Sequence, residues 1–171
     1  MSTEQPAGWF RTVRTRRTVL AAMVLVPFTA LPGIAEARPR APRVLFICQF
    51  GSVKSAISRE LFRRRAAERG ITAIAVSRGI HPESHLDTQL RERLAGQSID
   101  PARDGQHKLT RSDLRRADYT VLLDPLPPGW HGRVTRDWTD LGSFNQSYAT
   151  EEPRVKAKID QLLDEIATRP R

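Results

Sequence analysis

Residues 44–76 read VLFICQFGSVKSAISRELFRRRAAERGITAIAV, and this stretch decides the fold class. It opens on an unbroken apolar run, Val44–Ile47, which is typical of a strand buried on both faces of a parallel sheet. After a short loop, a helical pattern covers 56–69 and ends before Gly70. The apolar run Ile71–Val76 then predicts a parallel strand, so the stretch forms a βαβ unit with a right-handed crossover.

The chain after residue 76 continues the alternation of helices and strands. Tyr119–Leu123 predicts a third strand, and 124–148 is rich in proline and glycine and predicts loops. The further helices expected are 87–95, a short helix 112–117 capped by Thr110 or Ser112, and a last helix from Glu151 or Pro153 to Ala167. The sequence therefore predicts a small doubly wound α/β fold: a parallel sheet of about four strands with helices on both faces.

Residues 1–37 have the pattern of an export signal. Arginines precede the apolar run Val19–Leu31, which is shorter than the roughly 20 residues that a membrane span needs. Ala35-Glu36-Ala37 has the small-x-small pattern of a cleavage site, and Arg16-Arg17 resembles a bacterial twin-arginine signal. We expect a signal peptide over 1–37 and one periplasmic or secreted domain over 38–171. The alternative is an uncleaved anchor that holds the domain outside the cytoplasm, and membrane contact is expected only in that case.

The composition indicates an anionic partner. The chain carries 28 Lys and Arg against 19 Asp and Glu, a formal net charge of +9. Such a charge favours phosphorylated substrates, nucleic acid or an anionic membrane surface. Because only 6% of the residues are aromatic, base-stacking platforms are scarce, and nucleic-acid binding is not expected. We expect the domain to be a monomer.

Cys48 is the single cysteine of the sequence, which excludes an internal disulfide and a cysteine-rich zinc site. The four histidines are expected in surface loops, because Pro82 interrupts any helix that would bring His81 and His85 together. The sequence therefore predicts neither a metal nor a cofactor.

The loop 48–55 is the predicted site of the chemistry. Its backbone amides can turn inward around an anion, and the N-terminus of the following helix adds partial positive charge, which also stabilises a thiolate nucleophile at Cys48. Gly51 permits the tight turn, Lys54 offers a cation, and Ser55 supplies a hydroxyl to the sulfur. The expected phosphate-binding residues are Gln49, Phe50, Gly51, Ser52, Val53, Lys54 and Ser55. The alternative is that Cys48 is only a small buried residue at the end of a strand.

The motif Cys-x5-Lys-Ser over 48–55, directly after a buried strand, resembles a known loop. It is similar to the Cys-x5-Arg-Ser loop of the low-molecular-weight protein tyrosine phosphatases and of the arsenate reductases that share their fold. The similarity continues through VSRGIHPE (76–83) and LTRSDLRRADYTVLLD (109–124) and covers nearly all of 43–167. The resemblance implies a hydrolase in which Cys48 forms a cysteinyl-phosphate and Ser55 assists the thiolate.

The resemblance also implies a general acid, an aspartate in a late loop. Asp140 is the best match, and Asp124 and Asp137 are the alternatives. Two positions depart from the family pattern. Lys54 replaces an arginine that clamps the phosphoryl oxygens with two parallel hydrogen bonds, and Leu141 follows Asp140 where proline is usual.

Three functions stand as hypotheses. The first is a phosphomonoester phosphatase, acting on substrates such as protein phosphotyrosine through a Cys48 phosphoenzyme. Lys54 favours the second, a catalytically weak domain that binds phosphate, arsenate or a phosphorylated partner. The third is an arsenate reductase, which would need an external thiol because the chain has no further cysteine to relay oxidation.

Overall fold

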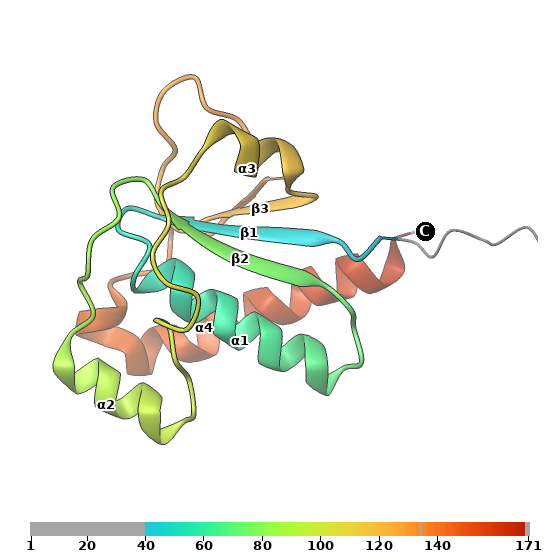
Figure 1. Ribbon diagram of the computed structural model, residues 1–171. Helices are drawn as coiled ribbons and strands as arrows, with labels where there is room; N and C mark the ends of the chain where they lie inside the picture. Colours follow the sequence, from blue (N-terminus) through green and yellow to red (C-terminus); the bar gives the residue numbers. More distant parts are fainter. Residues whose placement is uncertain (1–39, 134, 170–171) are drawn as a thin grey trace, which may run out of the picture. The chain divides into compact units, whose positions relative to one another are not determined.

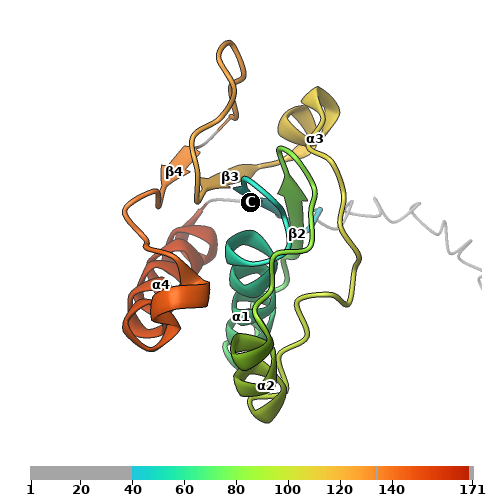
Figure 2. The same ribbon diagram turned by 90° about the vertical axis from the view of Figure 1, so that its left-hand side faces the viewer.

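The computed structural model describes residues 40–133 and 135–169, so the predicted export signal lies outside the described residues. Four parallel strands form one sheet in the order β2-β1-β3-β4 (Figure 1 and Figure 2). Their bounds are β1 Arg43–Cys48, β2 Ile74–Gly79, β3 Tyr119–Leu122 and β4 Thr135–Asp137. The structure confirms the parallel α/β sheet and places its first loop, after Cys48, at the carboxyl end of β1.

The helices cover both faces of this sheet. Their bounds are α1 Lys54–Glu68, α2 Thr88–Gly96, α3 Arg111–Arg116 and α4 Phe144–Thr168. Figure 2 shows α1, α2 and α4 on one side of the sheet and α3 on the other. Within the parts of the chain that the structure describes, no helix combines the length and apolar character that a membrane crossing requires.

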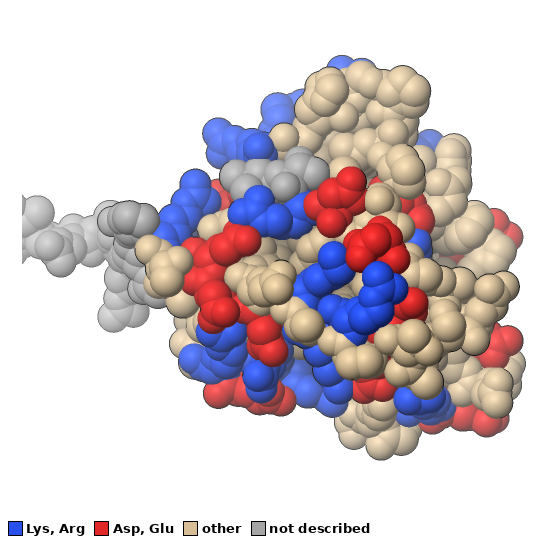
Figure 3. All heavy atoms as spheres, turned by 180° about the vertical axis from the view of Figure 1, so that it is seen from behind, with Lys and Arg blue, Asp and Glu red and all other residues tan. Residues whose placement is uncertain are grey.

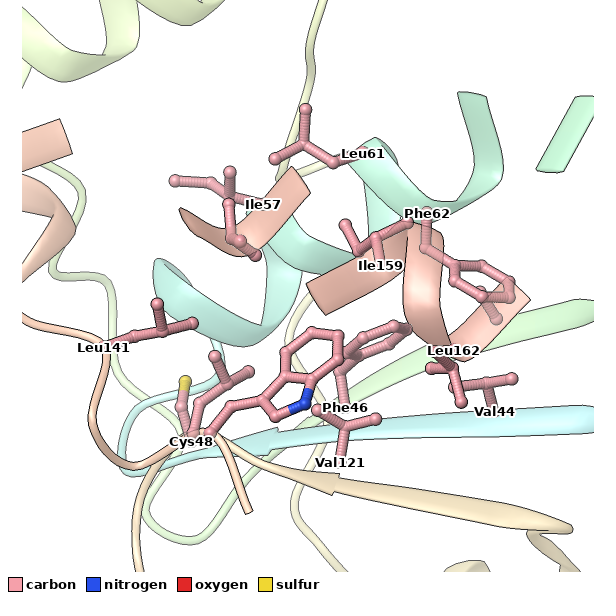
Figure 4. Packing of buried hydrophobic residues seen from close by; sticks show 14 of the residues in the cluster. Val44, Phe46, Cys48, Ile57, Leu61, Phe62, Val121, Leu141, Ile159 and Leu162 are labelled. Carbon is pink, nitrogen blue, oxygen red and sulfur yellow. The ribbon is translucent and has the colours of Figure 1, made fainter. Parts of the chain in front are cut away.

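The strand β1 supplies both halves of the core, which is why its sequence is apolar without alternation. Val44, Phe46 and Cys48 belong to the cluster beneath α1 and α4, and Cys48 ends this cluster at the carboxyl end of the strand (Figure 4). Leu45 and Ile47 point to the opposite face and pack with residues of the α3 side. The burial of β1 on both faces fixes the position of Cys48.

The strand β2 begins at Ile74, three residues later than predicted. Gly70 has a φ of +65° and ends α1, and the Ile71 N–H donates to the Ala66 carbonyl at 2.9 Å. Ile71 is therefore part of the chain reversal after the helix rather than of the strand. The strand continues to Gly79 because the whole length of β1 pairs with it.

The start of α3 is set by a local capping residue, whereas the start of α4 is set by packing. Thr110, and not Ser112, caps α3, in a capping box with Asp113. The helix α4 starts earlier than predicted, because Phe144 and Tyr148 are buried, and it bends at Ser147. The short strand β4 also lies in the segment that was predicted to be loop.

Arg59 on α1 is a buried cation in the middle of this fold, only 1% exposed. Its guanidinium donates to Glu60 Oε1 at 2.9 Å, to Ser77 Oγ at 2.8 Å and to the Pro101 carbonyl at 3.0 Å. A buried charge is tolerated only when it is paired and hydrogen-bonded in this way. The network joins α1 to β2 and to the segment after α2, and so holds the helix that follows the Cys48 loop.

Candidate active site

The Cys48 sulfur lies where β1 ends and α1 begins. The side chain is only 3% exposed, and Sγ is 3.0 Å from Ser55 Oγ. The backbone N–H groups of Gly51 and Ser55 approach the sulfur at 3.2 and 3.5 Å. Three hydrogen-bonding groups therefore surround Sγ, an arrangement that stabilises negative charge on the sulfur.

The loop amides are available to an anion. Val53 is the N-cap of α1, and no side chain caps this helix end. Within residues 40–133 and 135–169, the N–H groups of Phe50, Ser52, Val53 and Lys54 have no protein acceptor. Unpaired amides at a helix N-terminus form a binding site for phosphate or a similar oxyanion. In the part of the loop that the structure describes, these four donors are thus unoccupied by the protein itself.

Two glycines let this loop close against β2. Gly51 has a φ of +75°, and a Cβ atom there would lie 2.8 Å from the Gly79 nitrogen. A Cβ atom on Gly79 would lie 2.7 Å from the Phe50 carbonyl carbon. Both positions need glycine because backbone meets backbone. The sequence indicated Gly51, but the role of Gly79 was missed; the only signal for it was its place at the end of the VSRG segment.

The segment after β2 supports the loop from one side. The His81 and Glu83 N–H groups donate to the carbonyls of Gln49 and Phe50 at 2.8 and 3.1 Å. The His85 N–H donates to Ser52 Oγ at 3.1 Å, and the His85 ring lies 3.9 Å from the Phe50 ring, centroid to centroid. These contacts occupy loop carbonyls, so that the unpaired groups of the loop are mainly donors.

Lys54 contacts Asp124 at the end of β3. Its Nζ lies 2.5 Å from Asp124 Oδ1 and 2.7 Å from the Leu123 carbonyl, and both charged side chains are largely shielded, at 18% and 25% exposure. The other Asp124 oxygen accepts from the Gln49 N–H at 2.8 Å. Asp124 thus binds both ends of the loop to β3. The ammonium group that was expected to face an oxyanion is here neutralised by a carboxylate.

The three candidate general acids lie in different surroundings. Asp140 is 53% exposed and forms ion pairs with Arg154 and Lys158 of α4, at 2.9 and 3.0 Å. Asp137 accepts from the Thr139 hydroxyl and N–H at 2.6 and 2.9 Å. Among the three, Asp124 is the one in direct contact with the loop.

Hydrogen bonds lower the pKa of two of these carboxyl groups. The bond from Lys158 lowers the pKa of Asp140, and the charge of Arg154 acts in the same direction. The Thr139 hydroxyl and N–H lower the pKa of Asp137. A general acid must hold its proton near the working pH, so a lowered pKa restricts either residue to acidic conditions. The role of Asp140 stays a prediction.

Acidic and basic side chains intermingle on the face of the domain formed by α4 and β4 (Figure 3). Asp140, Arg65 and Arg69 all contribute ion pairs with residues of α4. Among the described residues, no group of three or more His, Cys, Asp or Glu side chains is placed to hold a metal ion.

Comparison with known proteins finds a matching family for the part of the chain that contains the Cys48 loop. Residues 43–126 match the family model described as low molecular weight phosphotyrosine protein phosphatase. No curated protein matches the sequence.

Solved structures share the fold at low sequence identity. The YfkJ protein of Bacillus subtilis has a TM-score of 0.62 and 19% identity, over 79% of this chain and 100% of that one. A low molecular weight protein tyrosine phosphatase of the same organism has a TM-score of 0.59 and 15% identity, over 75% and 99%. A thioredoxin-dependent arsenate reductase of Corynebacterium glutamicum has a TM-score of 0.58 and 22% identity, over 77% of this chain; the match spans only 64% of the reductase. Residues 43–126 thus match the low molecular weight phosphotyrosine protein phosphatase family, and the described chain shares its fold with solved phosphatases and arsenate reductases.

Proposed function

We propose that the protein is a cysteine-dependent phosphomonoester phosphatase that accepts aryl phosphates such as phosphotyrosine. The observation that carries the proposal is the arrangement around the sulfur. Cys48 Sγ lies 3.0 Å from Ser55 Oγ, inside a loop in which several backbone amides have no described protein acceptor, at a helix N-terminus without a side-chain cap. This arrangement supplies a nucleophile and an oxyanion site at the same place.

The reaction follows in two steps. The thiolate attacks phosphorus, an S–P bond forms as the bond from phosphorus to the ester oxygen breaks, and the leaving oxygen takes a proton from an aspartic acid. Water then attacks phosphorus and gives a proton to the same aspartate, and the S–P bond breaks to release phosphate and the thiolate. The Ser55 hydroxyl, beside the sulfur, stabilises the thiolate in both steps.

A second function, oxyanion binding without efficient turnover, is favoured by the Lys54–Asp124 ion pair. An ammonium held by a carboxylate contributes less to the transition state than a free cation, and it lacks the two-pronged geometry of a guanidinium. The loop amides alone would still bind phosphate or arsenate. An arsenate reductase would in addition need an external thiol to take up the oxidation.

Hydrolysis of p-nitrophenyl phosphate under reducing conditions separates these functions. We expect the parent chain to turn over, and Lys54→Arg to raise kcat by roughly tenfold or more, because arginine restores bidentate contact with the phosphoryl oxygens. An inactive parent that Lys54→Arg activates would indicate an oxyanion-binding protein instead. If neither protein hydrolyses the ester, the phosphatase proposal is wrong.

A general-acid role for Asp140 predicts a specific pH dependence. The protonated carboxyl is lost as pH rises through a pKa that lies below the ordinary value, so kcat for phenyl phosphate should already fall in the acid range. We expect Lys158→Gln to move this falling limb to higher pH, because the bond from Lys158 lowers the pKa of Asp140. Lys156→Gln is the control, since Lys156 pairs with Glu152. An unmoved limb together with full activity of Asp140→Asn would assign the acid to Asp124 or Asp137.

We also propose that residues 1–37 export the domain, because arginines precede an apolar run and a small-x-small motif. Sequencing the N-terminus of the protein recovered from the periplasm or the medium should give Arg38. Recovery of the chain from the membrane fraction with Met1 in place would support the anchor.

A further inference from the structure

A basic pocket lies between α3 and the segment that follows β3. We call it the α3 pocket; its volume is about 540 Å³. The side chains that matter for its chemistry are Arg111, Arg115, Trp130, His131 and Arg133. Its size is that of a site for a small ligand or a few residues of a peptide.

The positive charge of the α3 pocket is not neutralised by the described part of the chain. Arg111, Arg115 and Arg133 form no ion pair with any described carboxylate, and no Asp or Glu lines the pocket. The one carboxylate of α3, Asp113, is occupied by Arg78 at 3.1 Å and by its capping partner Thr110. Many arginines elsewhere in the domain are paired, so this concentration of unpaired guanidinium groups indicates an anionic ligand.

Trp130 gives the pocket a fixed wall. The indole is partly buried on the core cluster of the α3 side, and the Arg111 guanidinium lies 5.5 Å from the ring centroid. A turn holds Trp130 in place, with its N–H donating to the Pro127 carbonyl at 3.1 Å and Gly129 at a φ of +75°. Arg111 is therefore positioned before a ligand arrives.

Both walls of the pocket are linked along the chain to residues next to the Cys48 loop. The Leu109 N–H donates to the carbonyl of Gly79, the residue that packs on Gly51. Arg111 follows Leu109 by two residues, so the backbone of Arg111 lies at most about 7 Å from that of Leu109. The other wall leaves from Asp124, which binds the Gln49 N–H. Figure 2 shows α3 and the orange segment after β3 on the same side of the sheet. The pocket and the loop are thus linked through Gly79 and Asp124.

We propose that the α3 pocket binds an acidic segment of a phosphotyrosine-containing peptide while the Cys48 loop holds the phosphate. Three guanidinium groups favour binding of carboxylates. Because the pocket is separate from the loop, it would bind residues beside the phosphotyrosine and not the phosphotyrosine itself. The inference rests on the proposed function for the identity of the reacting group. The basic pocket itself does not depend on turnover.

The first test compares two phosphotyrosine peptides of equal length, one with three Glu beside the phosphotyrosine and one with three Gln. We expect the parent to prefer the Glu peptide at least tenfold in kcat/KM at low salt, and salt to reduce this preference. The triple variant Arg111→Gln, Arg115→Gln, Arg133→Gln should bring the ratio close to one. Arg116→Gln is the matched control, because Arg116 lies on the same helix but does not line the pocket, and it should keep the preference.

The second test measures binding of a fluorescent, unphosphorylated Glu peptide by anisotropy and does not need turnover. We expect the triple variant to weaken binding at least tenfold, and Cys48→Ser and Arg116→Gln to leave it within twofold. An inactive parent that binds this peptide in the expected pattern would overturn the phosphatase but support the pocket. The inference would be overturned if each charge removed cost the same peptide affinity in the triple variant as in Arg116→Gln. Equal affinity of the parent for the Glu and Gln peptides would overturn it as well.

Discussion

Cys48→Ser is expected to lower the hydrolysis of p-nitrophenyl phosphate by about 10⁴-fold or more, the scale of removing a catalytic nucleophile. The serine hydroxyl is protonated at neutral pH and is a far weaker nucleophile than a thiolate. Serine also fits the space of the thiol, and Ser55 Oγ and the Gly51 N–H can bond to its oxygen. The fold and the loop should therefore be kept while the chemistry is lost.

Phosphate binding provides the control for this variant. Titration calorimetry should give parent and Cys48→Ser dissociation constants for inorganic phosphate within about threefold, which corresponds to less than 1 kcal/mol. Because Cys48 is the only cysteine of the chain, one equivalent of iodoacetate should inactivate the parent, and phosphate should protect it. Undiminished activity of the serine variant would show that Cys48 is only a buried residue at a strand end.

Gly79→Ala should reduce kcat/KM by at least a hundredfold, although Gly79 contributes no functional group. The added methyl would lie 2.7 and 2.8 Å from the Phe50 carbonyl carbon and oxygen and 2.9 Å from the Gly51 nitrogen. Since these are backbone atoms, the loop must move, and the donors around Cys48 move with it. Overpacking of this kind also lowers the free energy of unfolding by about 1–3 kcal/mol.

Gly96→Ala is the matched control for this effect. Gly96 is the last residue of α2, and a Cβ atom there meets nothing within 4 Å. Alanine should leave kcat/KM unchanged and raise stability by up to about 1 kcal/mol through helix propensity. Urea unfolding together with p-nitrophenyl phosphate kinetics measures both quantities. Full activity in Gly79→Ala would show that the Gly51–Gly79 contact does not hold the loop.

Contacts between distant residues were beyond prediction because each depends on which strands become neighbours. Lys54 meets Asp124 only because β3 pairs with β1, and this contact gives the predicted anion ligand a carboxylate partner. Arg59 stands near a run of arginines that suggests a solvated helix face, yet β2 and the Pro101 carbonyl bury it. In both cases the residue type alone does not determine whether the side chain will be exposed, buried or paired.

The sequence by itself determined the βαβ opening, the all-parallel sheet, and the position of Cys48 between a buried strand and a helix start, because apolar runs, periodicity and Gly70 act over a few neighbouring residues. It also indicated the loop members from Gln49 to Ser55. Only the tertiary structure decided that Gly79 must lack a side chain, that Asp124 neutralises Lys54, and that unpaired arginines gather beside Trp130. These features arise where segments far apart in the chain come within van der Waals or hydrogen-bonding distance, and that proximity is set by the packing of the whole sheet.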